Sequence, residues 1–216
     1  MCFYSQLTKD ALTIAQRFRV KFNEPEKFSP SSLYNGFEHP STPVIADYAQ
    51  DKIHLFNWGL IPHWSNDINI RRYTLNARIE DLENIKSFKD SINNRCLVIS
   101  DGFFEWKEII YNGKKKKIRH LITLEDGSLF AFAGLYTVRR NNSGEFHNGS
   151  YTIITTEANE VVREIAHKKM RMPVILRPSD ENYWLSGVDH RGFAFPYSCD
   201  LRSITLECIP AENKLF

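Results

Sequence analysis

Apolar residues recur at helical spacing in several parts of the chain. Between Lys9 and Phe22, one stripe carries Ala11, Ile14, Ala15, Phe18 and Phe22, which predicts a helix with Thr8 as its N-cap. Asp81–Asn94 shows the same spacing with Ile85, Phe88 and Ile92 on one face, and a third helix is expected from about Glu157 to Ala166. Ser179 is expected to cap a short fourth helix that Gly187 ends.

Short alternating or continuously apolar runs predict strands over most of the remaining chain. The expected strands are Val44–Tyr48, Ile53–Asn57, Cys96–Ile99, Phe103–Lys107, Lys117–Leu124, Leu129–Tyr136, Tyr151–Thr156, Met172–Leu176 and Ser203–Ile209. Glu125–Ser128 is expected to join two of them as a hairpin, and Asn112–Gly113 before Lys114–Lys117 indicates a hairpin tip. Ser29–Pro43, rich in Ser, Pro, Asn and Gly, indicates a long surface loop.

Helices and strands do not alternate regularly, which disfavours a doubly wound parallel sheet. The pattern predicts an α+β fold with a mostly antiparallel, barrel-like sheet and peripheral helices. At 216 residues, 42% of them hydrophobic, the chain can fill one core. We therefore expect residues 1–216 to form a single domain.

Composition narrows the class of protein. No apolar run approaches the roughly 18 residues of a membrane span, and the start lacks the basic-then-apolar pattern of a signal peptide. The four cysteines form no CxxC pair, and no Cys/His set has zinc-ligand spacing. We expect a cytoplasmic monomer with no membrane partner, metal or other cofactor.

The net charge of +2 is too small to indicate an anionic partner by itself. Basic residues nevertheless cluster at Arg71–Arg72, Lys114–Lys117, Arg139–Arg140 and Lys168–Arg171. Each cluster taken singly is typical of a solvated loop.

Cys2 directly follows the initiator methionine. Removal of Met1 would leave an α-amine and a thiol on the same residue, and this pair can close a five-membered ring on an aldehyde. The two groups have ordinary pKa values of about 7.7–8.0 and about 8.5, so both are partly reactive near neutral pH. Position alone favours the interpretation that the cysteine is merely tolerated there.

Polar residues set among aromatic ones are the other candidates for chemistry. Glu105 lies between Phe104 and Trp106 on a predicted strand, where it faces either solvent or a cleft whose apolar walls would raise its pKa. His167 lies near the end of a predicted helix, and Asn76 is compatible with a buried structural amide. Each residue alone has a structural explanation of equal weight.

Together, these segments resemble the SOS response-associated peptidase (SRAP) family. The resemblance rests on Cys2 after methionine and on WGLIPxW, NAR, DGFFEW, AGL and His…RMPVIL segments. They occur in the family's order at Trp58–Trp64, Asn76–Arg78, Asp101–Trp106, Ala133–Leu135 and His167–Leu176.

The resemblance implies covalent capture of abasic sites in single-stranded DNA, with association with the nucleoid when bound. It implies that Cys2 is the nucleophile, that Asn76 positions its α-amine, and that Glu105 and His167 move protons. DNA contacts are implied for Arg78, Trp64 and Trp106, and further phosphate contacts are expected from Arg71 and Arg171. The family name also indicates a peptidase, which at minimum would remove Met1.

The chain departs from the family pattern at four places. Phe3 and Tyr4 follow Cys2 where glycine and arginine are usual, and the Tyr-Asn-x-x-Pro loop is longer here, at Tyr34–Pro40. Ser65 replaces an aromatic residue, and His167 precedes Arg171 by four residues instead of two. Two alternatives remain: a peptidase or amidase that uses an N-terminal cysteine, and a non-covalent single-stranded DNA-binding module.

Overall fold

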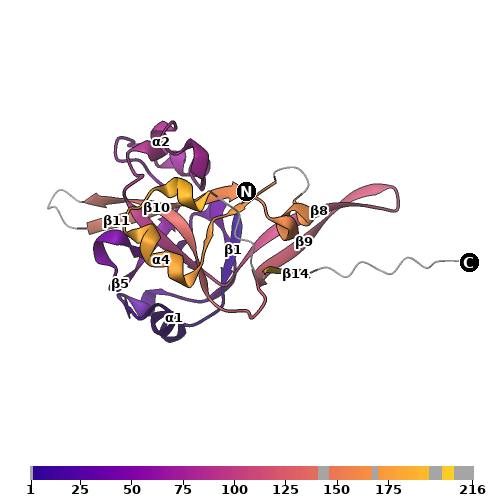
Figure 1. Cartoon of the computed structure of the whole chain (residues 1–216), viewed down its shortest axis with the longest axis horizontal. Helices are drawn as coiled ribbons and strands as arrows, with labels where there is room; N and C mark the ends of the chain where they lie inside the picture. Colours follow the sequence, from indigo (N-terminus) through magenta and orange to yellow (C-terminus); the bar gives the residue numbers. More distant parts are fainter. Residues whose placement is uncertain (1, 141–145, 167–169, 195–200, 207–216) are drawn as a thin grey trace, which may run out of the picture.

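The computed structural model describes residues 2–140, 146–166, 170–194 and 201–206, which form two sheets with short helices at their edges (Figure 1). The first sheet is antiparallel in the order β14-β9-β8-β1-β3, so the N-terminal strand pairs on both edges. Its strands are β1 (Tyr4–Leu7), β3 (Ser31–Asn35), β8 (Gly102–Tyr111), β9 (Lys114–Leu124) and β14 (Leu201–Thr205).

The second sheet has the order β12-β11-β10-β7-β4-β5-β2. Its strands are β2 (Lys21–Phe22), β4 (Ser41–Ala46), β5 (Lys52–Trp58), β7 (Arg95–Ser100), β10 (Phe130–Arg140), β11 (Phe146–Glu157) and β12 (Arg171–Pro173), with β6 (Asn76–Arg78) on β11 and β13 (Ile175–Leu176) on β10. A two-residue parallel pairing of β5 with β11 curls this sheet towards a barrel without closing it along its length. The predicted α+β, mostly antiparallel, barrel-like fold is confirmed.

The described helices are short and peripheral: α1 (Ala11–Phe18), α2 (Lys86–Lys89), α3 (Glu160–Ile165) and α4 (Pro178–Leu185). None of them is long and apolar enough to cross a membrane. The side chain of Trp184 anchors α4, because its indole Nε1 donates to the Cys96 carbonyl at 3.1 Å and the Arg95 guanidinium lies over its ring.

The N-terminal helix differs from the prediction at both ends. Asp10, not Thr8, is the N-cap of α1, and its carboxylate accepts from the Thr13 amide at 2.8 Å. Thr8 instead donates its amide to the Asp101 carboxylate at 3.0 Å, which ties the end of β1 to the turn before β8. The helix ends at Phe18 and does not continue to Phe22, because the C-cap residue Arg19 has a φ of 56°, in the left-handed region.

Three other local predictions are wrong. The expected helix over Asp81–Asn94 shrinks to α2, because three-residue turns such as Ser91 N to Phe88 O and Asn94 N to Ser91 O break the helical ladder. The expected loop Ser29–Pro43 contains β3 and the start of β4, which gain their order from cross-strand pairing. Pro178, not Ser179, begins the fourth helix, with Arg177 at its N-cap.

The turn at Glu125–Ser128 does not form a hairpin. Its flanking strands, β9 and β10, belong to different sheets, so the turn carries the chain from one sheet to the other. The last strand, β14, begins earlier than expected, and residues 207–209 of the predicted strand lie outside the described residues.

The hairpin predicted at Asn112–Gly113 is confirmed and joins β8 to β9. Both turn residues have positive φ, 49° and 72°, as a two-residue primed turn requires. The turn pairs Tyr111 with Lys114 and, six residues further from the tip, Glu105 with His120. It therefore determines which residue of β9 lies opposite Glu105.

Replacing Gly113 tests the conformational demand of this turn. A Cβ at Gly113 would meet nothing within 4 Å, so Gly113→Ala should lower the free energy of unfolding only through the left-handed backbone, by about 1 kcal/mol. Urea denaturation measures this loss. Gly192→Ala is the matched control, because a Cβ at Gly192 also meets open space but the residue does not have a positive φ. An equal loss of unfolding free energy in both variants would contradict this explanation.

Candidate active site

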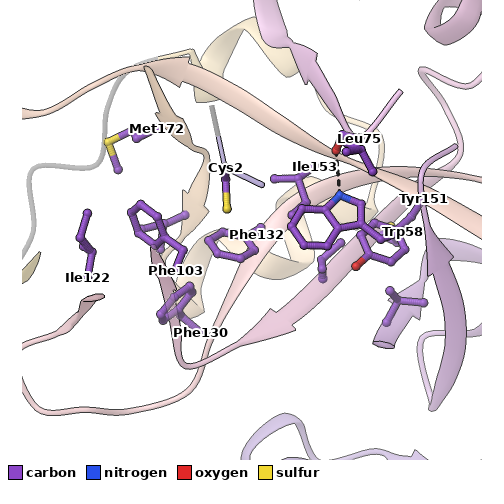
Figure 2. Packing of buried hydrophobic residues seen from close by; sticks show 14 of the residues in the cluster. Cys2, Trp58, Leu75, Phe103, Ile122, Phe130, Phe132, Tyr151, Ile153 and Met172 are labelled. Carbon is purple, nitrogen blue, oxygen red and sulfur yellow. Dashed lines mark hydrogen bonds between the residues drawn. The ribbon is translucent and has the colours of Figure 1, made fainter. Parts of the chain in front are cut away.

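The Cys2 side chain lies inside the protein, within one of the two clusters of buried apolar residues formed by the described part of the chain. It is 0% exposed, and Figure 2 shows its sulfur pointing inward beside Phe132, with Phe103 nearby. The Sγ lies 3.4 Å from the Tyr4 carbonyl oxygen, to which the thiol donates. Burial and the negative charge of Glu105 raise the pKa of the Cys2 thiol to about 12, so it is neutral near pH 7.

Backbone contacts fix the segment around Cys2. The Gly36 amide donates to the Phe3 carbonyl at 2.9 Å, and a Cβ at Gly36 would come within 3.3 Å of the Trp58 ring. Trp58 is itself fully buried and donates from Nε1 to the Leu75 carbonyl at 2.9 Å (Figure 2). The WGLIP segment thus forms part of the wall against which the N-terminus packs.

Asn76, on β6, contacts Cys2 directly. Its Nδ2 donates to the Cys2 backbone carbonyl at 2.8 Å. Its Oδ1 is buried and has no hydrogen-bond partner among the described residues. A buried acceptor without a hydrogen-bond partner lowers the stability of the folded state. Here the acceptor belongs to a side chain that is already hydrogen-bonded to the Cys2 carbonyl.

Glu105 faces the same interior as Cys2. It is 9% exposed and lies on the face of β8 that also carries buried Phe103, two residues earlier. Its charge is close enough to raise the pKa of the Cys2 thiol. The candidate residues Cys2, Asn76 and Glu105 therefore converge, although they come from β6, β8 and the segment before β1.

His120 is a fourth polar residue at this position, and the residue patterns considered singly did not indicate it. It lies directly opposite Glu105 in the β8–β9 ladder and is 9% exposed. Its Nδ1 lies 2.8 Å from the Ser203 hydroxyl on β14, and burial and the charge of Lys107 lower its pKa. Counting back from the Asn112–Gly113 turn would have placed it there.

Trp106 and Arg78 flank the buried residues. Trp106 follows Glu105 on β8, and its ring meets Tyr4 edge-on with centroids 4.8 Å apart. Arg78 lies two residues after Asn76 on β6, with its side chain 58% exposed and Nη1 3.8 Å from the Asp81 carboxylate. Tyr4 thus occupies a place beside Trp106 that the family pattern gives to an arginine.

Trp64 and Arg71 lie in the segment between β5 and β6. Trp64 is 40% exposed, and the Lys86 ammonium lies 4.6 Å from its ring centroid. Arg71 helps to line a cavity of about 300 Å³ together with Arg139 and Ser150. These side chains offer an exposed ring and positive charge to a ligand.

Arg171 is already paired. Its guanidinium contacts both carboxylate oxygens of Glu80, and Nη2 also donates to the Thr155 carbonyl at 2.7 Å. Its side chain is only 13% exposed. A phosphate would have to compete with these partners.

His167 lies outside the described residues. Within the described ranges, no group of three or more His, Cys, Asp or Glu side chains gathers as metal ligands would.

Comparison with known proteins identifies the family of the chain. A sequence profile of the SOS response associated peptidase (SRAP) family matches residues 1–208. The chain belongs to the SRAP family. A structure of a Bacteroides thetaiotaomicron protein superposes on this SRAP chain with a TM-score of 0.84 at 29% identity, covering 95% of this chain and 92% of that one.

Curated relatives of this SRAP chain share one descriptive name. "Abasic site processing protein YoqW" of Bacillus subtilis (strain 168) is 35% identical over 198 residues, covering 86% of this chain and 80% of that protein. "Abasic site processing protein YMR114C" of Saccharomyces cerevisiae is 32% identical over 181 residues, which cover 82% of this chain and 42% of that protein. "Abasic site processing protein HMCES" of Xenopus tropicalis is 28% identical over 180 residues, 71% of this chain and 52% of that protein.

The electrostatic contact between Glu105 and Cys2 can be measured. Glu105→Gln removes the charge but not the burial, so the pKa of the Cys2 thiol should fall from about 12 and stay above the ordinary value of a thiol. The pH dependence of iodoacetamide labelling, followed on the Cys2 peptide by mass spectrometry, gives this pKa. Glu108→Gln, on the opposite face of β8, is the control, and an unchanged profile in Glu105→Gln would refute the contact.

Proposed function

We propose that this protein processes abasic sites in DNA by capturing them covalently in single strands, through a thiazolidine on Cys2 after removal of Met1. The observation that carries the proposal is the contact of Asn76 with Cys2. One amide atom holds the Cys2 carbonyl at 2.8 Å, while the other is a buried acceptor without a partner among the described residues. An α-amine on Cys2 would supply the missing donor.

The reaction follows from the two nucleophiles of Cys2. The α-amine adds to the aldehyde of the ring-opened abasic sugar, and loss of water gives an imine. The thiol sulfur then bonds to the imine carbon while its proton passes to the nitrogen, which closes the ring. The second step is intramolecular, where effective molarities reach roughly 10⁵–10⁸ M in good geometry.

Burial of the thiol favours this order of steps. Burial and the charge of Glu105 raise the pKa of the Cys2 thiol to about 12, so the thiol is protonated near pH 7. The amine is therefore the first nucleophile, and the thiol needs a nearby base when it adds. Glu105 supplies a carboxyl group beside it. In its protonated form this group donates a proton to the sugar ring oxygen as the ring opens, and the resulting carboxylate then relays the thiol proton to the nitrogen.

The other candidate residues have supporting roles in the proposal. His167 shuttles a proton during imine formation, Arg78 and Arg71 neutralise phosphates, and Trp64 and Trp106 stack on bases. Arg171 reaches phosphate only by exchanging its contact with Glu80. The protein acts as a monomer on DNA in the cytoplasm and is nucleoid-associated when bound.

The crosslinking proposal predicts a heat-stable adduct with an abasic single strand. Protein without Met1 should give it, and protein carrying an uncleavable N-terminal extension should not, because its α-amine is blocked. Denaturing gel electrophoresis separates the adduct. Cys2→Ala is the matched control, since it keeps an α-amine and should give an adduct only when borohydride reduces its imine. A heat-stable adduct formed by this variant without borohydride would disprove the proposal.

Asn76→Asp tests the positioning of the amine. The substitution keeps the shape of the side chain but sets an acceptor against the Cys2 carbonyl. Because displacement of a reacting group by about 1 Å can cost about 10²-fold, adduct formation should slow by that order. Single-turnover kinetics measure the rate, and an unchanged rate would remove Asn76 from the proposed site.

The family description also contains the word peptidase. We include in the proposal that the chain removes its own Met1, with Cys2 as thiol nucleophile and Glu105 and His167 moving protons. Cell-free synthesis without methionine aminopeptidase, followed by intact-mass measurement, should show Met1 lost from the wild type and kept in Glu105→Gln. Retention of Met1 in both would assign its removal to another enzyme.

A further inference from the structure

The β8–β9 hairpin extends beyond the body of the molecule as a two-stranded ribbon (Figure 1). Directly opposed residues of an antiparallel pair share a face, as do alternate residues along each strand. The face that carries Glu105 and His120 therefore continues towards the tip as Lys107 opposite Ile118, Ile109 opposite Lys116, and Tyr111 opposite Lys114.

This face of the ribbon places three lysines in one row that starts at the candidate active site. The lysine row is defined here as Lys107, Lys116 and Lys114. Lys114 and Lys116 are exposed, and Lys107 is half-buried. The charge of Lys107 lowers the pKa of His120, so the first lysine of the row acts electrostatically on the site itself.

The opposite face of the same ribbon is different. There Lys117 lies opposite Glu108, and the Lys115 ammonium is 2.9 Å from the Glu108 carboxylate. On the site face, neither strand contributes a carboxylate between Glu105 and the tip. The site face is therefore distinguished by its position, because its lysines lie on the same face of the ribbon as Glu105 and His120.

We propose that the lysine row binds the phosphate backbone of the nucleic-acid strand that leads away from the candidate active site. The identity of this strand as the one holding the abasic site rests on the proposed function. Tyr111, at the end of the row, offers its ring to a base.

The dimensions of the ribbon suit a linear polyanion. From Glu105 to Tyr111 the strand rises about 20 Å, at roughly 3.3–3.4 Å a residue. A row one lysine wide matches a backbone better than it matches the plane of a membrane. Lysine is also a common phosphate ligand, which acts as a point charge and needs no fixed geometry.

Two double variants on opposite faces test the proposal. Lys114→Gln/Lys116→Gln changes the site face and Lys115→Gln/Lys117→Gln the other face, with the same loss of charge. Both are made in a Cys2→Ala background, and binding of an undamaged, fluorescently labelled single strand is followed by anisotropy over a salt series. Circular dichroism verifies that both variants fold.

The site-face variant should bind about tenfold more weakly, and its slope of log K against log[salt] should be shallower by about 1.4, the equivalent of two phosphate contacts to a single strand. The control variant should keep the wild-type slope. Equal losses from both faces, or no loss from either, would overturn the proposal.

Crosslinking with abasic DNA separates this inference from the proposed function. At saturating DNA the site-face variant, with Cys2 restored, should form adduct at the wild-type rate, and only the DNA concentration needed for half-maximal rate should rise. If the wild type forms no adduct but the salt slope of the site-face variant is still shallower, the proposed covalent capture is wrong and phosphate binding by the lysine row is supported. If the wild type forms the adduct but the salt slope of the site-face variant equals that of the wild type, phosphate binding by the lysine row is wrong and covalent capture is supported.

Discussion

The first strand, β1, hydrogen-bonds on both edges, to β3 on one side and β8 on the other, and the arrangement of the site depends on this insertion. Chain termini usually fray, but here the end is held by sheet pairing and by the bond from Asn76 to the Cys2 carbonyl. Apolar burial also stabilises the position of the N-terminal segment, because Cys2 packs among aromatic side chains. In the proposed reaction, Cys2 is thereby positioned before any substrate arrives.

The same burial limits what the thiol can do alone. An apolar surrounding and the charge of Glu105 keep the Cys2 thiol protonated, which protects it from reagents that need a thiolate. A protected thiol suits a reaction in which sulfur attacks second and only within a bound intermediate. In the account proposed here, stability of the N-terminus and selectivity of its chemistry have the same physical origin.

Much of the fold and of the candidate site could be predicted from the sequence, and the wrong predictions have local structural causes. The turn at Asn112–Gly113 followed from dipeptide chemistry, and the Glu105–His120 pair follows from counting along its ladder. The helix expected over Asp81–Asn94 failed because tight turns replaced it despite suitable apolar spacing. The convergence of Cys2, Asn76 and Glu105 came from the family resemblance, since contacts between distant segments leave no periodic signal.

The most direct test of the central claim is the bonding state of Cys2 in the isolated adduct. After digestion of protein and DNA, tandem mass spectrometry of the N-terminal peptide should find one sugar remnant on Cys2. In denaturant, neither its thiol nor its α-amine should react with labelling reagents, because a thiazolidine occupies both. A thiol that still alkylates, or a remnant attached to a lysine, would contradict the account.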